Sequence, residues 1–186
     1  MPDPVVETKT LLRGLPSLKG PFRPLDLASF SSTPHEAFRI WLQDAIDNNI
    51  KEPHAMILST VDEHGCPDAR VLILKNVDHR GWHFAIKANS PKGNQITNNP
   101  AVALTFYWPQ LGRQIRIRGT ATELEASECA ADFLERPAGS KATALASKQS
   151  EVLEDTAMLK RNLAEAQMRI EAEPQHVSPT WKVFTI

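Results

Sequence analysis

The sequence predicts a mainly β protein with flanking helices, arranged as an antiparallel β-barrel. Short apolar runs follow one another through brief turns, which is typical of antiparallel strands that lie side by side. Amphipathic helical patterns precede and follow these runs, where they can pack against the outside of a barrel. The 186 residues suit one domain, and they contain no internal repeat or low-complexity tract.

The first 30 residues are rich in Pro, Leu and charge, without a clear period. Because Pro16, Pro21 and Pro24 interrupt helices, we expect no helix there. Residues 1–30 are therefore interpreted as an N-terminal arm, and residues 31–186 as the domain.

An amphipathic helix is expected over about residues 34–49. Thr33, Pro34 and Glu36 are suited to the N-cap, the first helical position and the third, which together form a capping box. The apolar residues that follow recur at helical spacing and predict a face packed against the core. They are Phe38, Trp41, Leu42, Ala45 and Ile46.

Six strands and three further helices are expected after this helix. The strand-like runs are residues 55–61, 69–77, 82–86, 101–107, 114–123 and 181–184. In the run 114–123, Ile and Gly alternate with Arg and Thr, which is typical of a half-buried strand. The helical segments begin at about residues 91, 126 and 156, and they end near residues 98, 135 and 171.

Composition argues against several functional classes. The formal net charge of -1 argues against a generally basic nucleic-acid-binding protein. The two cysteines, Cys66 and Cys129, could form one bridge, but they do not supply a disulfide framework or a zinc site. The sequence shows neither a secretory signal nor a run of about 20 apolar residues, so we expect a cytoplasmic protein without membrane contact.

The familiar catalytic motifs are missing from the sequence. It shows no hydrolytic triad, no Walker loop and no GxGxxG, and its six histidines lack the spacing of metal ligands. We therefore expect no metal site and name no catalytic residue.

Cations at the two ends of one strand are the first candidate binding residues. Arg70 and Lys75 flank the apolar run between them. Strict alternation would place them on opposite faces, where they would serve different parts of a ligand, unless a bulge realigns them. The alternative is that both are solvated strand ends.

The start of the short helix is the second candidate. Ser90, Pro91 and Lys92 open it, and the unpaired N–H groups at a helix start favour an anion. A lysine in the first turn is unfavourable to the helix dipole unless an anion is bound. Together with Arg70, this start predicts a phosphate pocket, and the alternative is an ordinary helix start.

These residues belong to a set of motifs that runs in unbroken order over about residues 34–183. The set comprises Ala69–Lys75, Gly81-Trp82-His83-Phe84, Ser90-x-Lys92, Gln95-Ile96, Asn99-Pro100, Arg113-Gln114, Arg136-Pro137 to Ser140, and Ser147-Lys148-Gln149-Ser150. It resembles the pyridoxamine 5′-phosphate oxidase family. The resemblance implies a split β-barrel and a homodimer that binds FMN at the subunit interface.

The resemblance also implies roles for individual residues. Arg70 and Lys92 would bind the FMN phosphate, and Gln114 would form a hydrogen bond with the flavin. The implied cofactor residues are Arg70, Val71, Leu72, Ile73, Leu74, Lys75, Ala85, Ile86, Lys92, Gln114, Gln149, Ser150 and Trp181. Lys75, Arg136 and Ser140 match the residues that bind the phosphate of pyridoxamine or pyridoxine 5′-phosphate.

Three departures from the family pattern bear on activity. Pro91 stands where the family commonly has an arginine, and Asp132 stands where it has a tyrosine that binds substrate phosphate. A carboxylate beside a phosphate dianion is repulsive unless Arg136 neutralises it. The sequence given ends at Ile186, before the family's Arg-Leu-His-Asp-Arg segment. We therefore expect FMN binding, with weak or absent oxidation of pyridoxamine 5′-phosphate.

The function that the resemblance implies is an FMN-binding oxidoreductase that acts on B6 phosphates or on another small ring substrate, such as a phenazine precursor. The flavin would carry the redox chemistry, and the protein would orient the substrate. One alternative is a non-enzymatic protein that binds FMN or a B6 phosphate. Another is a structural domain without a ligand, which a yellow colour of the purified protein would exclude.

Overall fold

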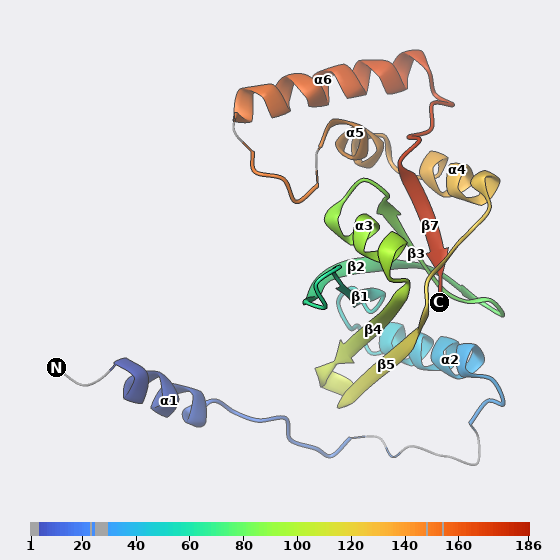
Figure 1. Cartoon of the computed structure of the whole chain (residues 1–186). Helices are drawn as coiled ribbons and strands as arrows, with labels where there is room; N and C mark the ends of the chain where they lie inside the picture. The colour runs from blue at the N-terminus through green and yellow to red at the C-terminus, as the bar shows by residue number, and fades with distance from the viewer. Residues whose placement is uncertain (1–3, 23, 25–29, 148, 154) are drawn as a thin grey trace.

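A seven-stranded antiparallel sheet forms the centre of the described structure (Figure 1). This computed structural model describes residues 4–22, 24, 30–147, 149–153 and 155–186. The strands are β1 (Ala55–Val61), β2 (Pro67–Asp78), β3 (Gly81–Lys87), β4 (Ala101–Trp108), β5 (Arg113–Thr120), β6 (Thr122–Glu123) and β7 (Trp181–Thr185). The helices are α1 (Pro4–Gly14), α2 (Pro34–Asp47), α3 (Pro91–Asn98), α4 (Ala126–Leu134), α5 (Ala138–Ala146) and α6 (Thr156–Ala172), with a short 3-10 turn, η1 (Pro109–Leu111), after β4. The predicted fold class, mainly β with flanking helices, is confirmed.

The order of the strands explains why the sheet closes on itself. The order is β5-β4-β1-β2-β3-β7-β6, so β5 and β6 lie at opposite ends of it. Only Ala121 separates these two strands in the chain. The sheet must therefore curl until its two ends approach each other, which produces the split barrel. The single strand predicted over 114–123 is accordingly divided, because its first part pairs with β4 and its second part with β7.

Two short turns connect β1, β2 and β3. In the first, Asp62 Oδ1 accepts hydrogen bonds from the N–H groups of His64 (2.9 Å) and Cys66 (2.8 Å). In the second, Gly81 adopts a φ of 123°, and a Cβ there would lie 1.8 Å from the carbonyl oxygen of Ile186. Only glycine fits this position, since it combines a left-handed φ with a close backbone neighbour.

The main core lies between the curled sheet and α2. Phe38 of α2 packs against Trp82, Phe106 and Trp108, with ring centroids 5.7, 4.8 and 6.2 Å away. All four rings are buried. Tilted and edge-on contacts of this kind add to the free energy gained by burying the rings. α2 thus covers the core as the sequence predicts.

The beginning and the outer edge of α2 differ from expectation. The Thr33 hydroxyl donates to the Glu36 carboxylate (2.7 Å) and does not cap a backbone N–H, so the predicted capping box is not formed. Ile46, which the periodicity assigns to the buried face, is half exposed. Pro34 does occupy the first turn, where its missing N–H is not needed.

A second group of helices, α4 to α6, lies at the opposite end of the barrel from α2 (Figure 1). Phe133 of α4 meets Trp181 of β7 edge-on, with ring centroids 5.8 Å apart. Ala142 of α5 packs against Ala166 and Ile170 of α6. The sequence did not predict α5, because its run of Ala, Gly, Ser and Thr lacks a periodic apolar face.

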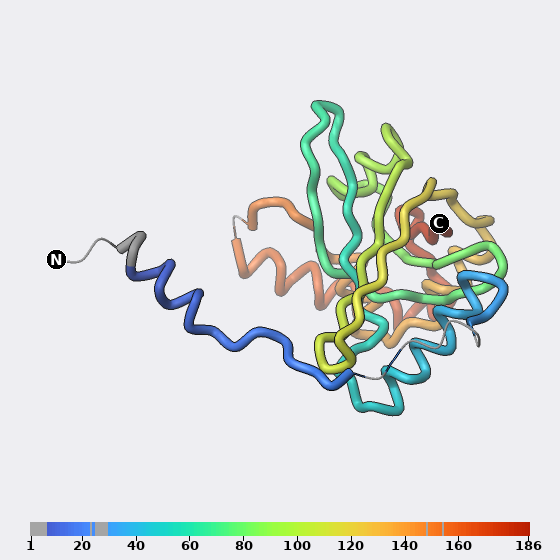
Figure 2. Tube along the Cα trace, turned by 90° about the horizontal axis from the view of Figure 1, so that it is seen from below, coloured from blue at the N-terminus to red at the C-terminus, as the bar shows by residue number. Residues whose placement is uncertain are grey.

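The expectation that residues 1–30 contain no helix is wrong. α1 forms and ends at Gly14, two residues before Pro16, so the prolines limit the helix without preventing it. Residues 7–22 are exposed, and Figures 1 and 2 show α1 apart from the barrel, while the segment after it runs back toward the barrel. Residues 1–3, 23 and 25–29 of the expected arm lie outside the described residues, as does Lys148.

The two cysteines do not form the disulfide bridge that the sequence allows. Cys66 is exposed near the turn between β1 and β2, Cys129 is buried in α4, and both are free. Within the described ranges, no helix is both long enough and apolar enough to cross a membrane.

The start of α3 approaches the end of β3 too closely for a side chain at position 93. A Cβ on Gly93 would lie 2.2 Å from the carbonyl oxygen of Ala88 and 2.7 Å from that of Lys87. We predict that Gly93→Ala lowers the free energy of unfolding by about 1–3 kcal/mol, because the backbone must shift to make room. Urea unfolding followed by circular dichroism measures this loss.

Gly139→Ala is the matched control for this prediction. Gly139 lies in α5, where a Cβ would have nothing within 4 Å. Alanine is preferred to glycine in helices, so this variant should keep the wild-type stability or gain up to about 1 kcal/mol. Equal losses in the two variants would show that the close approach at Gly93 is not what matters.

Candidate functional site

The predicted helix start at Ser90 is confirmed and carries a complete cap. The Ser90 hydroxyl accepts from the N–H of Gly93 (3.3 Å) and donates to the carbonyl oxygen of Lys87 (2.7 Å). Pro91 occupies the first helical position. The cap and the close approach at Gly93 fix the first turn of α3 against the end of β3. Lys92, the next residue of that turn, is thereby held inside the protein, only 4% exposed.

Two buried ammonium groups lie at this helix start. Lys92 Nζ donates to the side-chain oxygen of Gln149 (2.6 Å), and Lys87 Nζ donates to the carbonyl oxygen of Ser147. Burial, together with the nearby charges of Arg70 and Lys87, lowers the pKa of Lys92 to about 8, and the charge of Asp68 opposes this shift. Burial also lowers the pKa of Lys87, against the charge of Glu151. Positive charge is thus concentrated here at a cost in desolvation.

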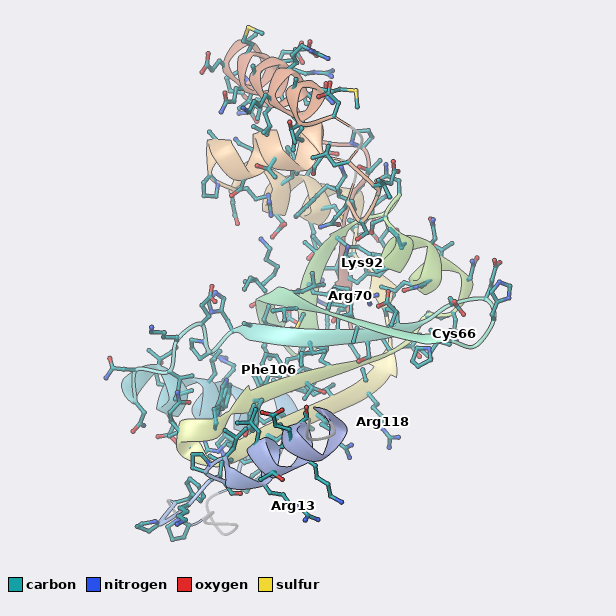
Figure 3. All side chains as sticks on the ribbon, turned by 90° about the vertical axis from the view of Figure 1, so that its left-hand side faces the viewer. Arg13, Cys66, Arg70, Lys92, Phe106 and Arg118 are labelled. Carbon is teal, nitrogen blue, oxygen red and sulfur yellow. The ribbon has the colours of Figure 1, made fainter. Side chains whose placement is uncertain are left out.

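Arg70 is the third cation of this cluster, and Figure 3 shows it beside Lys92. Its guanidinium donates to the Thr60 hydroxyl (2.6 Å) and to the side-chain oxygen of Gln95 (3.3 Å) on α3. It also forms an ion pair with Asp68, whose side chain is about half exposed. We call Arg70, Lys87 and Lys92 the α3 cation cluster.

A second polar cluster lies where β2 and β7 meet α4. Asp132 Oδ1 pairs with Lys75 Nζ (3.1 Å), and Asp132 Oδ2 accepts from the indole N–H of Trp181 (2.8 Å). The guanidinium carbon of Arg136 lies 4.1 Å from the centre of the Trp181 ring. Arg136 Nη2 also donates to the carbonyl oxygen of Ser140 (3.2 Å). We call Lys75, Asp132, Arg136 and Trp181 the Asp132 cluster.

Arg70 and Lys75 reach different helices, although they belong to one strand. Arg70 pairs across the sheet with Leu58, which lies in the main core, and its side chain extends to α3. Lys75 lies at a shift of register between β2 and β3, next to Leu74, and its side chain extends to α4. The strand therefore contributes one cation to each cluster.

The other predicted site residues fall into four groups. Gln149 joins the α3 cation cluster through Lys92, and Leu72, Leu74 and Ile86 face the main core. Ala85 packs against the pair of Phe133 and Trp181. The rest of the predicted set is not brought to either cluster: Val71, Ile73 and Gln114 are exposed on sheet strands, and Ser150 is exposed with a φ of 64°.

Two residues have roles that the sequence did not reveal. The sequence patterns did not single out Lys87. A signal was present, because Lys87 is the charged last residue of an apolar strand and lies five residues before Lys92. Arg113, part of a quoted motif, pairs with Asp44 (3.0 Å) and lies over the ring of Trp41 (5.0 Å). Arg113 therefore attaches α2 to β5, outside both clusters.

The curled sheet defines a split-barrel protein, and two cation-bearing clusters are built on it. A family model described as Pyridoxamine 5'-phosphate oxidase matches residues 42–169. A Pseudomonas paraeruginosa protein named Pyridoxine/pyridoxamine 5'-phosphate oxidase is 42% identical over 159 residues, which cover 84% of this chain and 74% of that protein. One of the same name from Paraburkholderia phytofirmans is 38% identical over 157 residues, or 84% and 73% of the two chains. This chain belongs to the pyridoxamine 5′-phosphate oxidase family.

Solved structures agree with this assignment. PhzG from Burkholderia lata, in complex with tetrahydrophenazine-1-carboxylic acid, has a TM-score of 0.83 and 28% identity, covering 89% of this chain and 82% of that one. A pyridoxamine 5'-phosphate oxidase-related, FMN binding protein from Nostoc punctiforme has a TM-score of 0.65 and 15% identity, covering 84% and 82%. The second likeness concerns the fold alone.

The lowered pKa of Lys92 leads to a prediction about stability. Between pH 8 and the ordinary pKa of 10.5, the unfolded chain keeps a proton on Lys92 that the folded chain has released. The contribution of Lys92 to the free energy of unfolding therefore rises with pH across this window. Below pH 8 the buried ammonium destabilises the fold, by up to about 3 kcal/mol.

Lys92→Met removes this charge and tests the sign. We predict that the variant is more stable than the wild type at pH 7, and that its advantage shrinks as the pH rises from 8 to 10.5. Urea unfolding of both proteins at several pH values, in buffer free of phosphate and flavin, gives the difference. A difference that does not change with pH would contradict the burial of charge at Lys92.

Proposed function

We propose that this chain binds FMN, with the terminal phosphate at the α3 cation cluster, and acts as an oxidoreductase on a small ring substrate. The observation that carries the proposal is the pair of buried ammonium groups of Lys87 and Lys92. Both donate to neutral oxygens, and among the described residues no buried carboxylate is paired with either ammonium group. Such an arrangement is costly by itself and becomes favourable when an anion is bound.

The residues present suit a phosphate group. Arg70 adds a guanidinium, and the capped start of α3 adds the positive end of a helix dipole. The carboxylates that face these cations, Asp68 and Glu151, are both exposed and leave the buried charge largely uncompensated. Pro91 replaces an arginine of the family pattern, and in our proposal Lys87 supplies a cation nearby.

The remaining predicted cofactor residues would line the flavin. When bound, FMN would supply the redox step by taking up two electrons and a proton from the substrate. The protein would contribute binding and orientation: Arg70, Lys87 and Lys92 hold the phosphate, and Gln149 orients the Lys92 ammonium. No step in this proposal requires a side chain to act as an acid or a base.

The Asp132 cluster is the proposed substrate site. It contains Lys75 and Arg136, which the sequence assigns to substrate phosphate, and Arg136 also contacts the backbone of Ser140, the third predicted residue. The curated relatives are named for pyridoxine or pyridoxamine 5′-phosphate, whereas the PhzG structure holds a phenazine carboxylic acid. Because Asp132 already pairs with Lys75, we propose weak or absent turnover of B6 phosphates. A non-enzymatic FMN-binding protein is the second candidate, favoured by the same occupied lysine.

Arg70→Ala tests the assignment of the two clusters. We predict that it weakens FMN binding about ten- to 150-fold, because a charged hydrogen bond is worth about 1.5–3 kcal/mol. Arg136→Ala should leave FMN affinity unchanged, since Arg136 belongs to the proposed substrate site. Titration of the apoprotein, followed by quenching of flavin fluorescence, measures both affinities.

The choice of flavin provides the control for this experiment. The wild type should prefer FMN to FAD, because the proposed site receives a terminal phosphate that is blocked in FAD. Preference for FAD, no binding at micromolar concentration, or equal effects of the two substitutions would reject the proposed division of roles. An assay for hydrogen peroxide, formed from oxygen while candidate amines or reduced rings are oxidised, then distinguishes an oxidase from a binding protein.

A homodimer is the second part of the proposal, and an exposed apolar patch on the sheet supports it. Ile57, Val71, Ile73 and Tyr107 are between 39% and 65% exposed. Ile57 pairs directly with Val71 and with Thr105, so the alternation of side chains puts all four on one face of the sheet. Exposed apolar residues gathered in this way mark interaction surfaces. Gln114 pairs with Tyr107 beside this patch, where it would lie at the subunit boundary.

We predict that light scattering at micromolar concentration gives a mass of twice 20.7 kDa. Ile57→Glu should shift the protein to monomer, because it buries a charge in the proposed interface. Met168→Glu is the matched control, since Met168 is also exposed but lies on α6. A wild-type monomer that still binds FMN tightly, or dissociation by both substitutions alike, would argue against this interface.

A further inference from the structure

The Asp132 cluster has an unusual distribution of hydrogen bonds. Both carboxylate oxygens of Asp132 are engaged, one by Lys75 and the other by Trp181. The side chains of Asp132 and Lys75 are 17% and 27% exposed, so water reaches the ion pair only in part. Water screens an interaction between charges less at such a place than on an open surface. Asp132 therefore largely cancels the charge of Lys75.

Arg136 is the cation of the cluster that keeps its charge and part of its hydrogen-bonding capacity. Its guanidinium carbon lies 4.1 Å from the centre of the Trp181 ring, a contact that restricts where the group can lie, and one Nη donates to the carbonyl oxygen of Ser140. Its Nε is buried and has no hydrogen-bond partner among the described residues. A buried donor without a partner is costly, and an acceptor supplied by a ligand would remove that cost.

The charges of the cluster can be counted directly. Lys75 and Arg136 contribute two positive charges and Asp132 one negative charge, which leaves one net positive charge. A carboxylate carries one negative charge, and its two oxygens match the planar fork of a guanidinium. A phosphoryl group carries close to two negative charges and would meet the oxygens of Asp132, which at neutral pH can only accept hydrogen bonds.

We propose that Asp132 determines which substrates this site takes, selecting a flat ring that carries one carboxylate over a ring that carries a phosphoryl dianion. The inference rests on the proposed function, because it assumes that the Asp132 cluster is the substrate site. Arg136 binds the carboxylate, Trp181 restricts where the Arg136 guanidinium can lie, and Asp132 withdraws Lys75 from anion binding. Asp132 is thus a specificity-determining residue, and it acts by position and charge.

A purely structural role for Asp132 is the competing explanation. In that case Asp132 would only join α4 to β2 and β7, and its removal would lower stability without altering the preference between anions. The two explanations therefore differ in a ratio of affinities, which a general loss of stability does not change. Asp132→Asn is the informative variant, because its side-chain oxygen can still accept from Trp181 while the negative charge is gone.

Two probes with the same ring isolate the effect of the anion. We would titrate the FMN-loaded protein with 2-naphthoate and with 2-naphthyl phosphate by calorimetry at pH 7.5. The wild type should bind the carboxylate at least as tightly as the phosphate. In Asp132→Asn the ratio should shift by about tenfold or more toward the phosphate, because repulsion is removed and Lys75 becomes available. Asp132→Glu should restore the wild-type preference.

Two further variants complete the design. Glu135→Gln removes an exposed carboxylate at the end of the same helix and should leave the ratio unchanged. Arg136→Ala should weaken binding of the carboxylate probe about tenfold or more, since it removes the proposed anion partner. Three results would each overturn the inference. The ratio of probe affinities could be the same in Asp132→Asn as in the wild type, or the wild type could prefer the phosphate probe. Arg136→Ala could also bind both probes as tightly as the wild type does. Absence of binding by either probe would overturn it as well.

The same titrations show whether the selection by Asp132 fails or the proposed function fails. Calorimetry needs no flavin signal, so the probes are also titrated into the apoprotein. Failure to bind FMN would contradict the proposed function, while the ratio of probe affinities would still decide the role of Asp132. Tight FMN binding with an unchanged ratio would leave the flavoprotein assignment standing and reject selection by Asp132.

Discussion

The step from β5 to β6 is the constraint on which the rest of the structure depends. These strands lie at opposite ends of the sheet order, yet a single residue, Ala121, connects them. The sheet must curl to allow this, and Ala121 is buried in the core that the curled sheet encloses. In β3 and β7, one face packs on the main core and the other packs against Phe133 of α4. The two polar clusters combine residues of β2, β3 and β7 with residues of α3 and α4.

Charge is placed in this barrel by two different means. At the α3 cation cluster, the capped helix start and the close approach at Gly93 hold ammonium groups inside the protein, with neutral oxygens as partners. At the Asp132 cluster, a carboxylate from α4 balances one cation and leaves another. The first arrangement favours a multiply charged group, and the second favours a singly charged one. A ligand that lies along β2 would therefore meet two electrostatic environments. They differ because the cations of one cluster have neutral oxygens as partners, whereas a cation of the other is paired with the Asp132 carboxylate.

Local patterns predicted the elements of the barrel well, because a half-buried strand and an amphipathic helix are specified by alternation of polar and apolar residues. The run 55–61 coincides with β1, and the short helix begins at Pro91 as expected. Errors occurred where a local pattern had competing outcomes. Thr33 and Glu36 have the residue types of a capping box but bond to each other, and α5 lacks the apolar period that would have predicted it. Proline at position 16 suggested an unstructured arm, yet α1 forms upstream of it.

The sequence by itself determined most strands and helices and singled out the cations Arg70, Lys75 and Lys92, and the resemblance to the family added Arg136. Strands, helices and motif residues can be recognised in this way because they depend on residue type and on spacing along the chain. Only the tertiary structure decided how those cations are grouped. Lys87 joins Lys92 because α3 folds back on β3, and Asp132 meets Lys75 and Trp181 because α4 packs where β2 and β7 come together. The burial and pKa of these side chains, and the net charge of each cluster, depend on neighbours that are distant in sequence. They are therefore set only in the folded protein, when the sheet has closed.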